Sequence, residues 1–544
     1  MNGFSIGSNT IFRSSSLRFA LFLIALTLLE AALTLLPGRL LITGHEGDLL
    51  HMIDAGLRMA DGELPHLDFM TPIGILGIAP VAVFLKFGAA AGQAAILANL
   101  LVCILLLPAT WWLGATRFNG GLRFIFGAMI IVLCTALVHG GGSTSIALSM
   151  YYNRWCWAVS LLILVATLLP PTRNHTAKWV DPFIIGLGMA TLALTKMTFF
   201  VPLAPAIILV LIVQRQFGVL WRSLLIGALA GGVSVLLLGV DFMVAYAHDL
   251  MAVAADGAGR AYPTNSLVGV LASPKMITAT VVLLFSIILF RKAGRYQQGL
   301  ILMIVAPAFV YITYQNWGND PKWLYFSILY LLSYLPEAGK RKFLGLPQRQ
   351  AGIVLVTIAV TAIAPSAMSL IGSTSRSAFA DYSTAMMIPL EPNLADLWMP
   401  KDRILVTNGV TPVVNLSPLD DTNEQVLING SLIPDCHTEG GLIALIYAQT
   451  KELEGLSELA GKQVLVADIL NVGWLLGDIS RVDGAATWYY DDTSGFDSAD
   501  YFMVPSCPLH QHSRTAMVEK MLESGWALDM RYSSKLMVLY QIVR

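Results

Sequence analysis

The stretch FALFLIALTLLEAALTLLP, which runs from Phe19 to Pro37, decides the fold class. It is almost entirely apolar, and its length approaches the roughly 20 residues that a helix needs to cross the hydrocarbon core of a bilayer. Arg13 and Arg18 precede the run, as in a signal peptide, but no small-x-small cleavage site follows it. We therefore interpret the run as a first membrane span that the protein retains.

The composition extends this interpretation to most of the chain. Hydrophobic residues make up 56% of the 544 residues and charged residues only 13%, whereas a soluble domain usually carries about 25% charged residues. The mean hydropathy is +0.67. These values predict a polytopic α-helical membrane protein. The formal net charge of -1 gives no indication of a nucleic-acid partner.

Further apolar runs follow the first span. They cover residues of about 73–90, 92–114, 121–139, 155–170, 182–213, 221–240, 276–291, 297–314, 322–335 and 351–371. Basic residues in short loops favour the cytoplasmic side of the membrane. To place every basic cluster inside, residues 182–213 must cross twice and residues 73–114 once. We therefore expect about 11–13 transmembrane helices, the higher counts applying if residues 73–90 form a full span.

The same basic residues set the orientation of the chain. The basic N-terminus and the segment Lys340–Arg349, which precedes the last span, are both expected inside. The first loop, residues 38–72, and everything after residue 371 then lie outside. Three more segments are expected on this external face: His139–Arg154, Asp241–Lys275 and Tyr314–Lys322.

The last part of the chain has a different pattern, in which β-rich runs alternate with helix-like stretches, as in an α/β domain. The β-rich runs are Arg403–Thr407, Gln463–Ala467, Tyr501–Pro505 and Leu536–Val543, and the helix-like stretches are Leu442–Leu456 and Arg514–Ser524. We expect a transmembrane domain at residues 1–371, a connecting segment at 372–400 and a soluble external α/β domain at 401–544. Cys436 and Cys507 could form a disulfide there, and the sequence leaves this pairing open.

The first external loop is rich in ionisable side chains, although the rest of the membrane region is poor in them. These residues are His45, Glu46, Asp48, His51, Asp54, Arg58, Asp61, Glu63, His66 and Asp68. An ordinary solvated loop would also account for them. Because ionisable groups next to a membrane are costly unless they are solvated or used, the loop is the first candidate for chemistry.

The loop resembles the first external loop of GT-C superfamily glycosyltransferases, which are polytopic enzymes that use polyprenyl-phosphate sugars. Protein O-mannosyltransferases and lipid A aminoarabinose transferases are examples. The resemblance rests on the stretch from Asp48 to Gly62 and on the element from Pro65 to Pro72 that follows it. The chain departs from the family pattern at Leu49, where a Glu is usual, and has Glu46 before Asp48 instead.

A second stretch, Gly186–Lys196, resembles the family's glycine-rich span that ends in Thr-Lys. A glycine-rich packing helix with a snorkelling lysine would have the same sequence pattern. The resemblance covers about the first 215 residues at the level of motifs, and the remainder agrees only in architecture.

The resemblance implies a fold, an activity and a location. The fold would be a GT-C-like transmembrane bundle with a C-terminal extracytoplasmic α/β domain, in the bacterial inner membrane. The activity would be transfer of a sugar, with inversion, from a polyprenyl-phosphate-linked donor to an acceptor hydroxyl on the external face. The acceptor would be a glycan, a lipid or a protein, and the other partners would be membrane lipids.

The resemblance also implies roles for single residues. Asp48 is the expected general base, with Glu46 as its substitute. The leaving phosphate needs cationic donors, for which the external candidates are Arg58, Arg154, Arg260 and Lys322. Each of these could instead be an interfacial anchor beside aromatic residues. Further substrate contacts are expected from His51, His66, Asp68 and Asp320.

A divalent metal ion is the one cofactor that the sequence leaves open. His45, Glu46, Asp48 and His51 could supply nitrogen and oxygen ligands, and His66 lies downstream. No HExxH signature is present, and some members of the family use an ion while others do not. We therefore assign no metal ligand from the sequence.

Two functions of other classes remain as alternatives. A transporter or flippase of a lipid-linked or sugar substrate would need polar groups at the bilayer midplane or inverted repeats. Lys196 is the main internal candidate, and no repeat is visible. A membrane-anchored sensor or scaffold would not need so many spans. The chain has no Walker loop, which disfavours an ATP-driven pump.

Overall fold

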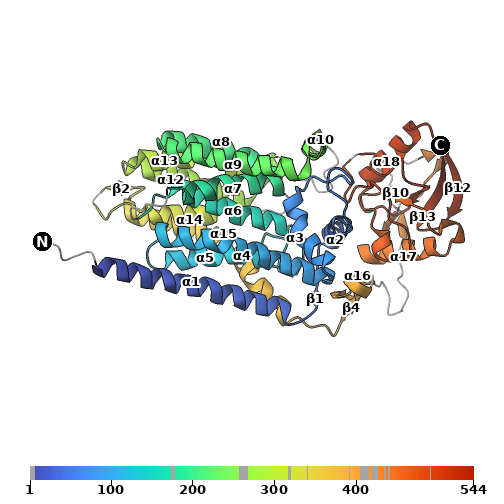
Figure 1. Cartoon of the computed structure of the whole chain (residues 1–544), viewed down its shortest axis with the longest axis horizontal. Helices are drawn as coiled ribbons and strands as arrows, with labels where there is room; N and C mark the ends of the chain where they lie inside the picture. The colour runs from blue at the N-terminus through green and yellow to red at the C-terminus, as the bar shows by residue number, and fades with distance from the viewer. Residues whose placement is uncertain are drawn as a thin grey trace.

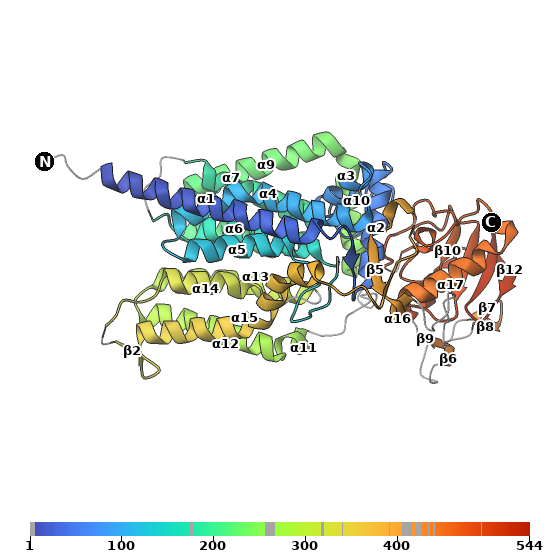
Figure 2. The same ribbon diagram turned by 90° about the horizontal axis from the view of Figure 1, so that it is seen from below.

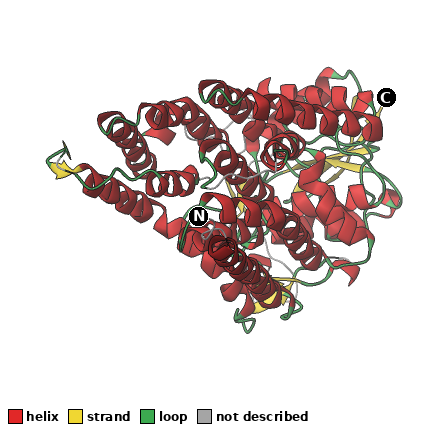
Figure 3. Cartoon of the chain, turned by 60° about the vertical axis from the view of Figure 1, so that its left-hand side comes forward, coloured by secondary structure: helices red, strands yellow, loops and turns green. Residues whose placement is uncertain are grey.

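The computed structural model describes residues 6–172, 178–255, 267–316, 320–339, 341–390, 392–404, 416–418, 427–433, 436–438, 441–490 and 492–544. Within these ranges the chain is mostly helical. Long helices lie side by side along the molecule, and the C-terminal part, in orange and red, packs at the end opposite the N-terminus (Figure 1). Coloured by secondary structure, the molecule is dominated by helices, and its strands are short (Figure 3).

Fifteen helices are described up to residue 378. They are α1 (Ile6–Leu35), α2 (Glu46–Ala60), α3 (Ile75–Lys86), α4 (Ala91–Arg117), α5 (Leu122–Thr135), α6 (Tyr151–Leu168), α7 (Val180–Thr195), α8 (Met197–Val213), α9 (Phe217–Leu238), α10 (Val240–Ala255), α11 (Leu267–Leu271), α12 (Pro274–Lys292), α13 (Tyr296–Gln315), α14 (Trp323–Ser333) and α15 (Gln348–Ala378).

Six of the described helices are long and apolar enough to cross a membrane, namely α1 from Ser16 onward, α4, α9, α12, α13 and α15. Five shorter apolar helices, α3, α5, α7, α8 and α14, accompany them. The prediction of a helical protein with several membrane spans is thereby confirmed in length and composition. Helix α9 is the least covered, with 6% of its apolar window buried. Its leucine and valine side chains therefore need an apolar surrounding such as lipid.

The two apolar stretches with an uncertain number of membrane crossings, residues 73–114 and 182–213, each form two helices. Residues 73–114 form α3 and α4, and α3 has only 12 residues. A helix of that length is about 18 Å long, less than the roughly 30 Å of hydrocarbon in a bilayer. Residues 182–213 form α7 and α8, which are separated at Lys196, where the backbone is extended with φ -158° and ψ 110°. This division is what two crossings in one run require.

Helix α6 lies at the centre of the bundle. All 18 of its residues are buried, including Trp157 at 1% exposure. The ring of Trp157 packs edge-on against Phe199 of α8, with ring centres 5.3 Å apart. Arg154 is on the first turn of this buried helix, so a charged side chain is enclosed by the core. Its partners are described with the candidate site.

The C-terminal part contains a four-stranded mixed sheet in the order β10-β11-β13-β12. Its strands are β10 (Val464–Val466), β11 (Tyr501–Pro505), β12 (Ala527–Ser533) and β13 (Met537–Val543), and two long helices, α17 (Leu442–Glu454) and α18 (Gln511–Glu523), accompany it. Strands β10 and β11 are parallel, and the other two pairs are antiparallel. Inward side chains such as Leu465, Phe502 and Met517 belong to one apolar cluster between sheet and helix.

The remaining described elements are short. They are β1 (Leu40–Leu41), β2 (Lys342–Phe343), β3 (Leu346–Pro347), β4 (Ala385–Met387), β5 (Leu397–Pro400), β6 (Leu416–Pro418), β7 (Leu427–Ile428), β8 (Ser431–Leu432), β9 (Cys436–Thr438), the α-helix α16 (Lys401–Ile404) and the 3-10 helices η1 (Pro392–Leu394), η2 (Ser457–Leu459) and η3 (Gly473–Leu475). In the three-stranded sheet β1-β5-β4, Leu40 pairs with Leu397. The expected connecting segment, residues 372–400, thus supplies two strands and the end of α15.

Most of the predicted C-terminal elements are present, and one prediction is wrong. Strands β10, β11 and β13 and helices α17 and α18 lie where the β-rich and helix-like stretches were expected. A strand was predicted at Arg403–Thr407, but Lys401–Ile404 is a helical turn and residues 405–407 lie outside the described residues. The strand β12 was not predicted.

The C-terminal part packs directly on the first loop. Helix α2 of that loop lies between the helical bundle and the sheet (Figure 2). A side chain at Gly47 would contact Leu442 of α17, Leu470 and Trp488, which shows how closely α2 approaches these residues.

The cysteines divide into free and bonded residues. Cys103, Cys134 and Cys156 are free and buried among apolar side chains. Cys507 is buried and forms a disulfide. The side chain of Cys436, its suggested partner, lies outside the described residues.

Candidate functional site

The candidate site is built at the first turn of α2. His45 precedes the helix in the left-handed conformation, with φ 61° and ψ 47°, and Glu46 and Asp48 occupy the first turn. Carboxylates are favourable there because the unpaired N–H groups give this end of a helix a partial positive charge. The Asp48 side chain is 21% exposed, so it lies largely inside the protein but keeps access to solvent.

His139 meets Asp48 from the segment between α5 and α6. Its Nδ1 lies 3.7 Å from Asp48 Oδ2 and 2.8 Å from Ser149 Oγ. The ring of His45 stacks on His139, with ring centres 3.9 Å apart and an angle of 10° between the planes. The sequence predicted that His139 is external, but nothing in it indicated that this residue would meet Asp48.

Lys196 is the cation whose charge lowers the pKa of Asp48. It lies at the break between α7 and α8, with Nζ 4.9 Å from the centre of the Tyr152 ring. Burial raises the pKa of Asp48 to about 6, and the positive charge of Lys196 acts in the opposite direction. A carboxylate with such a pKa is ionised at neutral pH and is basic enough to accept a proton. The fold thus brings together the two segments on which the family resemblance rests.

The histidines of the site are neutral at pH 7. Burial, together with the charges of His45, Arg154, Lys322 and Lys196, lowers the pKa of His139 to about 3. Burial also lowers the pKa of His45, with Glu46 acting in the opposite direction. A neutral imidazole offers a lone pair to a proton or a metal ion.

Glu46, the expected substitute for Asp48, is committed elsewhere. Its carboxylate is buried and forms an ion pair with Arg403 of α16, which donates from Nε. The carboxylate oxygen that binds Arg403 is therefore engaged within the protein and is not free to meet a substrate hydroxyl. This pairing favours Asp48 over Glu46 as the base.

Arg58 is fully buried and its donors are occupied. Nε lies 3.0 Å from Asp54 and Nη1 lies 3.2 Å from Glu63, while Nη2 donates to the Val482 carbonyl at 3.2 Å. The charged contacts continue through Arg481, which lies 2.7 Å from Glu63. This network favours a structural role for Arg58, holding α2 to the C-terminal part, over binding of a donor phosphate.

The two terminal nitrogens of Arg154 also donate to the protein. Nη2 donates to the Ala136 carbonyl at 2.7 Å, and Nη1 donates to the carbonyls of Val138 and Ser149. These three carbonyls belong to the segment that carries His139. Arg154 therefore shapes the loop that presents His139, and its side chain has no exposed face for a phosphate.

Lys322 and Asp320 lie together near this loop. Lys322 is 1% exposed and its Nζ lies 3.8 Å from Asp320 Oδ2, while Lys275 lies 3.1 Å from Oδ1 of the same carboxylate. The charge of Lys322 lowers the pKa of His139. A Cβ at Gly141, in the same loop as His139, would lie 3.8 Å from Asp320. Lys322 is thus a cation close to the site, and its nearest carboxylate is that of Asp320.

The other predicted residues of the first loop hold its shape. His51 is buried against Trp488, and burial lowers its pKa to about 4. His66 Nδ1 lies 2.9 Å from Asp249 of α10, whose carboxylate also accepts the N–H of Thr71. Asp68 is exposed and accepts the N–H of Leu64 at 2.6 Å, as a turn residue does. Arg260 lies outside the described residues.

A large apolar cavity adjoins Lys196. It has a volume of about 630 Å³ and lies between α7, α8, α9 and α10. Its lining includes Leu194 and Met197, which flank Lys196 closely in the chain, and Tyr246 of α10. The Tyr246 hydroxyl donates to the carbonyl of Ala193, which also lines the cavity, at 2.8 Å. The volume is within the range of small-molecule sites, and the wall is almost free of polar groups.

Glu30 is a buried ionisable residue that was not predicted as part of a site. It lies in α1 and is 6% exposed. Its carboxyl is hydrogen-bonded to Thr374 of α15 and Thr135 of α5. A single Glu inside the first apolar run was the available signal, since carboxyls within spans are rare and are usually functional or paired.

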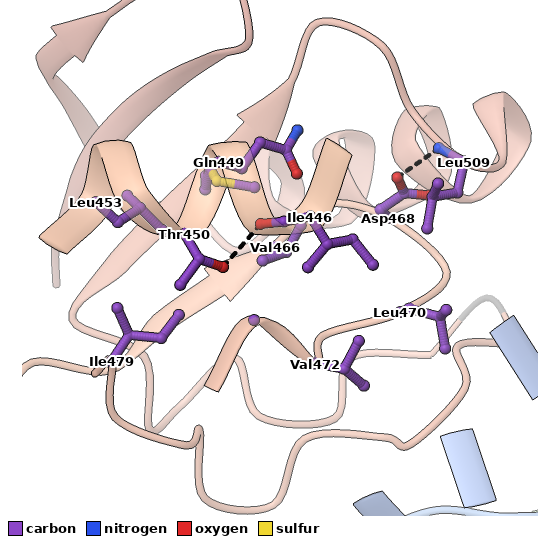
Figure 4. Close-up of a pocket in the computed structure, with 12 residues that line it drawn as sticks. Ile446, Gln449, Thr450, Leu453, Val466, Asp468, Leu470, Val472, Ile479 and Leu509 are labelled. Atoms are coloured by element: carbon purple, nitrogen blue, oxygen red, sulfur yellow. Dashed lines mark hydrogen bonds between the residues drawn. The ribbon is translucent and has the colours of Figure 1, made fainter. Parts of the chain in front are cut away.

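A second cavity lies in the C-terminal part and is small. It measures about 20 Å³ and is lined mainly by apolar side chains of α17 and its neighbours (Figure 4). Asp468 at its edge accepts the backbone N–H groups of Ile469, Leu509 and His510. The volume is about that of a water molecule, so this cavity cannot hold a sugar.

Comparison with known proteins adds no relative. No family model, no curated protein and no solved structure matches the chain. The function is therefore argued from the site itself.

Proposed function

We propose that the protein is a membrane glycosyltransferase that moves a sugar from a polyprenyl-phosphate-linked donor to an acceptor hydroxyl, with Asp48 as the general base. The observation that carries the proposal is the position of Asp48. It is a partly buried carboxylate under the influence of Lys196, and Lys196 lies between residues that line the large apolar cavity.

The arrangement suits a lipid-linked anionic donor. The hydrocarbon chain would occupy the cavity between α7 and α10, because its wall is apolar and it lies among the apolar helices. The phosphate would then lie near Lys196, and Lys322 is a second cation whose charge reaches the site. Lys196 thereby replaces Arg58 and Arg154 among the proposed phosphate-binding residues.

The chemistry would follow from these positions. The acceptor hydroxyl attacks the anomeric carbon from the side opposite the phosphate, and Asp48 accepts its proton as the new bond forms. The bond to the phosphate oxygen breaks, and the positive charge of Lys196 stabilises the leaving phosphate. One displacement inverts the anomeric centre and needs no covalent intermediate.

The proposal includes a location and a fold family. Asp48 and the C-terminal α/β part would face the outside of a bacterial inner membrane, in a GT-C-like chain of about 11–13 spans. The direct packing of α2 against the C-terminal part is compatible with both being on one side. The acceptor would be a glycan, a lipid or a protein that reaches this face.

The test is sugar transfer by the purified full-length protein, with a panel of polyprenyl-phosphate sugars and an envelope extract as acceptor. Asp48→Asn should abolish transfer without loss of protein. Asp402→Asn is the matched control, because Asp402 is an exposed carboxylate on α16. Transfer at the wild-type rate by Asp48→Asn would remove Asp48 from the mechanism. If the wild-type protein binds none of the donors, the proposal that it is a glycosyltransferase is rejected.

One observation favours a transporter or flippase as the second candidate. Glu30 places a carboxyl inside a span, hydrogen-bonded between α5 and α15. Carboxyls in this position mark ion or proton pathways in transporters. Movement of a labelled lipid-linked sugar across proteoliposomes, abolished by Glu30→Gln but not by Asp48→Asn, would support this candidate over the enzyme.

A further inference from the structure

The site contains a set of side chains suited to a metal ion. His45, Asp48 and His139 each offer a ligand atom, and these atoms lie within 4.8 Å of one another. Two of the ligands come from the start of α2 and the third from the segment before α6, which Arg154 holds through three backbone carbonyls. The set therefore depends on tertiary structure and not on neighbouring residues alone.

The ligand types indicate which ion would bind. Two imidazoles and one carboxylate form a mixed nitrogen and oxygen set, which suits Zn²⁺ and similar transition-metal ions better than Mg²⁺ or Ca²⁺. Three protein ligands also leave a fourth position for water or substrate, as in catalytic zinc sites. The sequence offered His45 and Asp48 together with Glu46 and His51, but Glu46 is paired with Arg403 and His51 packs on Trp488.

The distances require only small adjustments. Ligand atoms around a four-coordinate ion with bonds of about 2.0–2.2 Å lie about 3.4 Å apart. His139 Nδ1 and Asp48 Oδ2 are already at 3.7 Å. His45 is stacked at 3.9 Å on His139, so a rotation of its ring would bring a nitrogen toward the same point.

We propose that His45, Asp48 and His139 bind a single Zn²⁺-like divalent transition-metal ion. Its open position would accept an oxygen of the substrate, and as a Lewis acid it would stabilise negative charge there. This role rests on the proposed function, whereas binding of the ion does not. In the ion-bound state one oxygen of Asp48 would bind the ion, so only its second oxygen would remain to accept the proton in the proposed reaction.

The test measures metal binding and not sugar transfer. Purified full-length protein is stripped with a chelator and titrated with Co²⁺, whose visible absorption reports a site with few ligands. We expect saturation at one equivalent, displacement by Zn²⁺ and no displacement by excess Mg²⁺. His45→Ala and His139→Gln should each weaken binding about tenfold or more.

His51→Ala is the matched control, because His51 is a buried histidine one turn along the same helix and lies outside the set. It should bind Co²⁺ as the wild type does. The proposal is overturned if the wild-type protein shows no saturable Co²⁺ spectrum, or if both His45→Ala and His139→Gln retain wild-type affinity. Metal binding without sugar transfer would sustain this site and count only against the glycosyltransferase.

Discussion

Asp48 is subject to two opposing influences, and their balance decides its chemistry. Burial disfavours the ionised carboxylate, while the charge of Lys196 favours it. Burial dominates, which leaves the pKa at about 6. An exposed aspartate would be ionised at neutral pH as well, but its pKa would be about two units lower, which makes it a weaker base.

The activity should therefore depend on pH on the acidic side. In the proposed mechanism the carboxylate form is the base, so the rate should fall about tenfold per pH unit below an apparent pKa of about 6. Lys196→Met removes a charge that lowers this pKa, so the acidic limb should move to higher pH. A pH profile of kcat/KM measures both. Lys86→Met, which changes an exposed lysine of α3, should leave the limb in place; a limb unmoved in Lys196→Met would contradict the assignment.

Arg58 illustrates a residue whose charge serves stability. Arg58→Met should destabilise the protein by about 3–5 kcal/mol, because it leaves the buried Asp54 carboxyl without its partner. A denaturant titration of the protein in detergent measures the loss in free energy of unfolding. Lys451→Met removes a partly exposed pair with Glu454 and should cost less than about 1 kcal/mol. Equal losses in the two variants would show that the network around Arg58 contributes little.

At the scale of elements, α7 and α9 approach each other through a glycine. A Cβ at Gly186 would lie 2.4 Å from the Ser223 carbonyl oxygen, which belongs to the backbone and cannot rotate away. Gly186→Ala should therefore push α9 outward and destabilise the protein by about 1–3 kcal/mol.

Thermal unfolding of Gly186→Ala, beside Gly231→Ala, checks this packing. Gly231 also lines the apolar cavity, but a Cβ there meets no atom within 4 Å. Gly231→Ala should match the wild type or exceed it slightly, since alanine favours a helix over glycine. A Gly186→Ala protein as stable as the Gly231→Ala protein would mean that α9 is free to move.

Elements with strong local patterns were predictable from the sequence. The apolar runs, the division of residues 182–213 and strands β10, β11 and β13 follow from hydrophobic periodicity and charge. The strand expected at Arg403–Thr407 was wrong at its start, where α16 forms and where Arg403 pairs with Glu46. A tertiary ion pair of this kind overrides a weak local preference for strand.

At the scale of the whole molecule, the orientation in the membrane can be tested directly. Asp497→Cys places a thiol on the exposed surface of the C-terminal part, and Lys178→Cys places one before α7, on the expected cytoplasmic side. A membrane-impermeant maleimide added to intact spheroplasts should label the first and not the second. The wild-type protein gives the background, and permeabilised cells should label both. The reverse labelling pattern would show that the orientation is opposite to the one expected, so that Asp48 would not lie on the external face.

The candidate site was only partly predictable, because it joins distant segments. The family resemblance pointed to Asp48, and it included the stretch that ends at Lys196 without giving that lysine a role at the site. His139 and Arg403 could not be found, since no local pattern records that they meet residues of α2. Arg58 and Arg154 were expected at a phosphate because isolated external arginines bind anions. The hydrogen bonds of Arg58 and of the terminal nitrogens of Arg154 are visible only once the fold brings carboxylates and carbonyls to them.

The pairing of Leu40 with Leu397 has a consequence for the order of synthesis. The two residues are 357 positions apart (397 minus 40), and a ribosome adding about 5–20 residues per second needs roughly 20–70 seconds between them. During that time the first loop has been synthesised, but its partners β5 and Arg403 do not yet exist. The newborn chain can therefore complete the packing around the first loop only near the end of translation, and truncated products carry Asp48 without that packing.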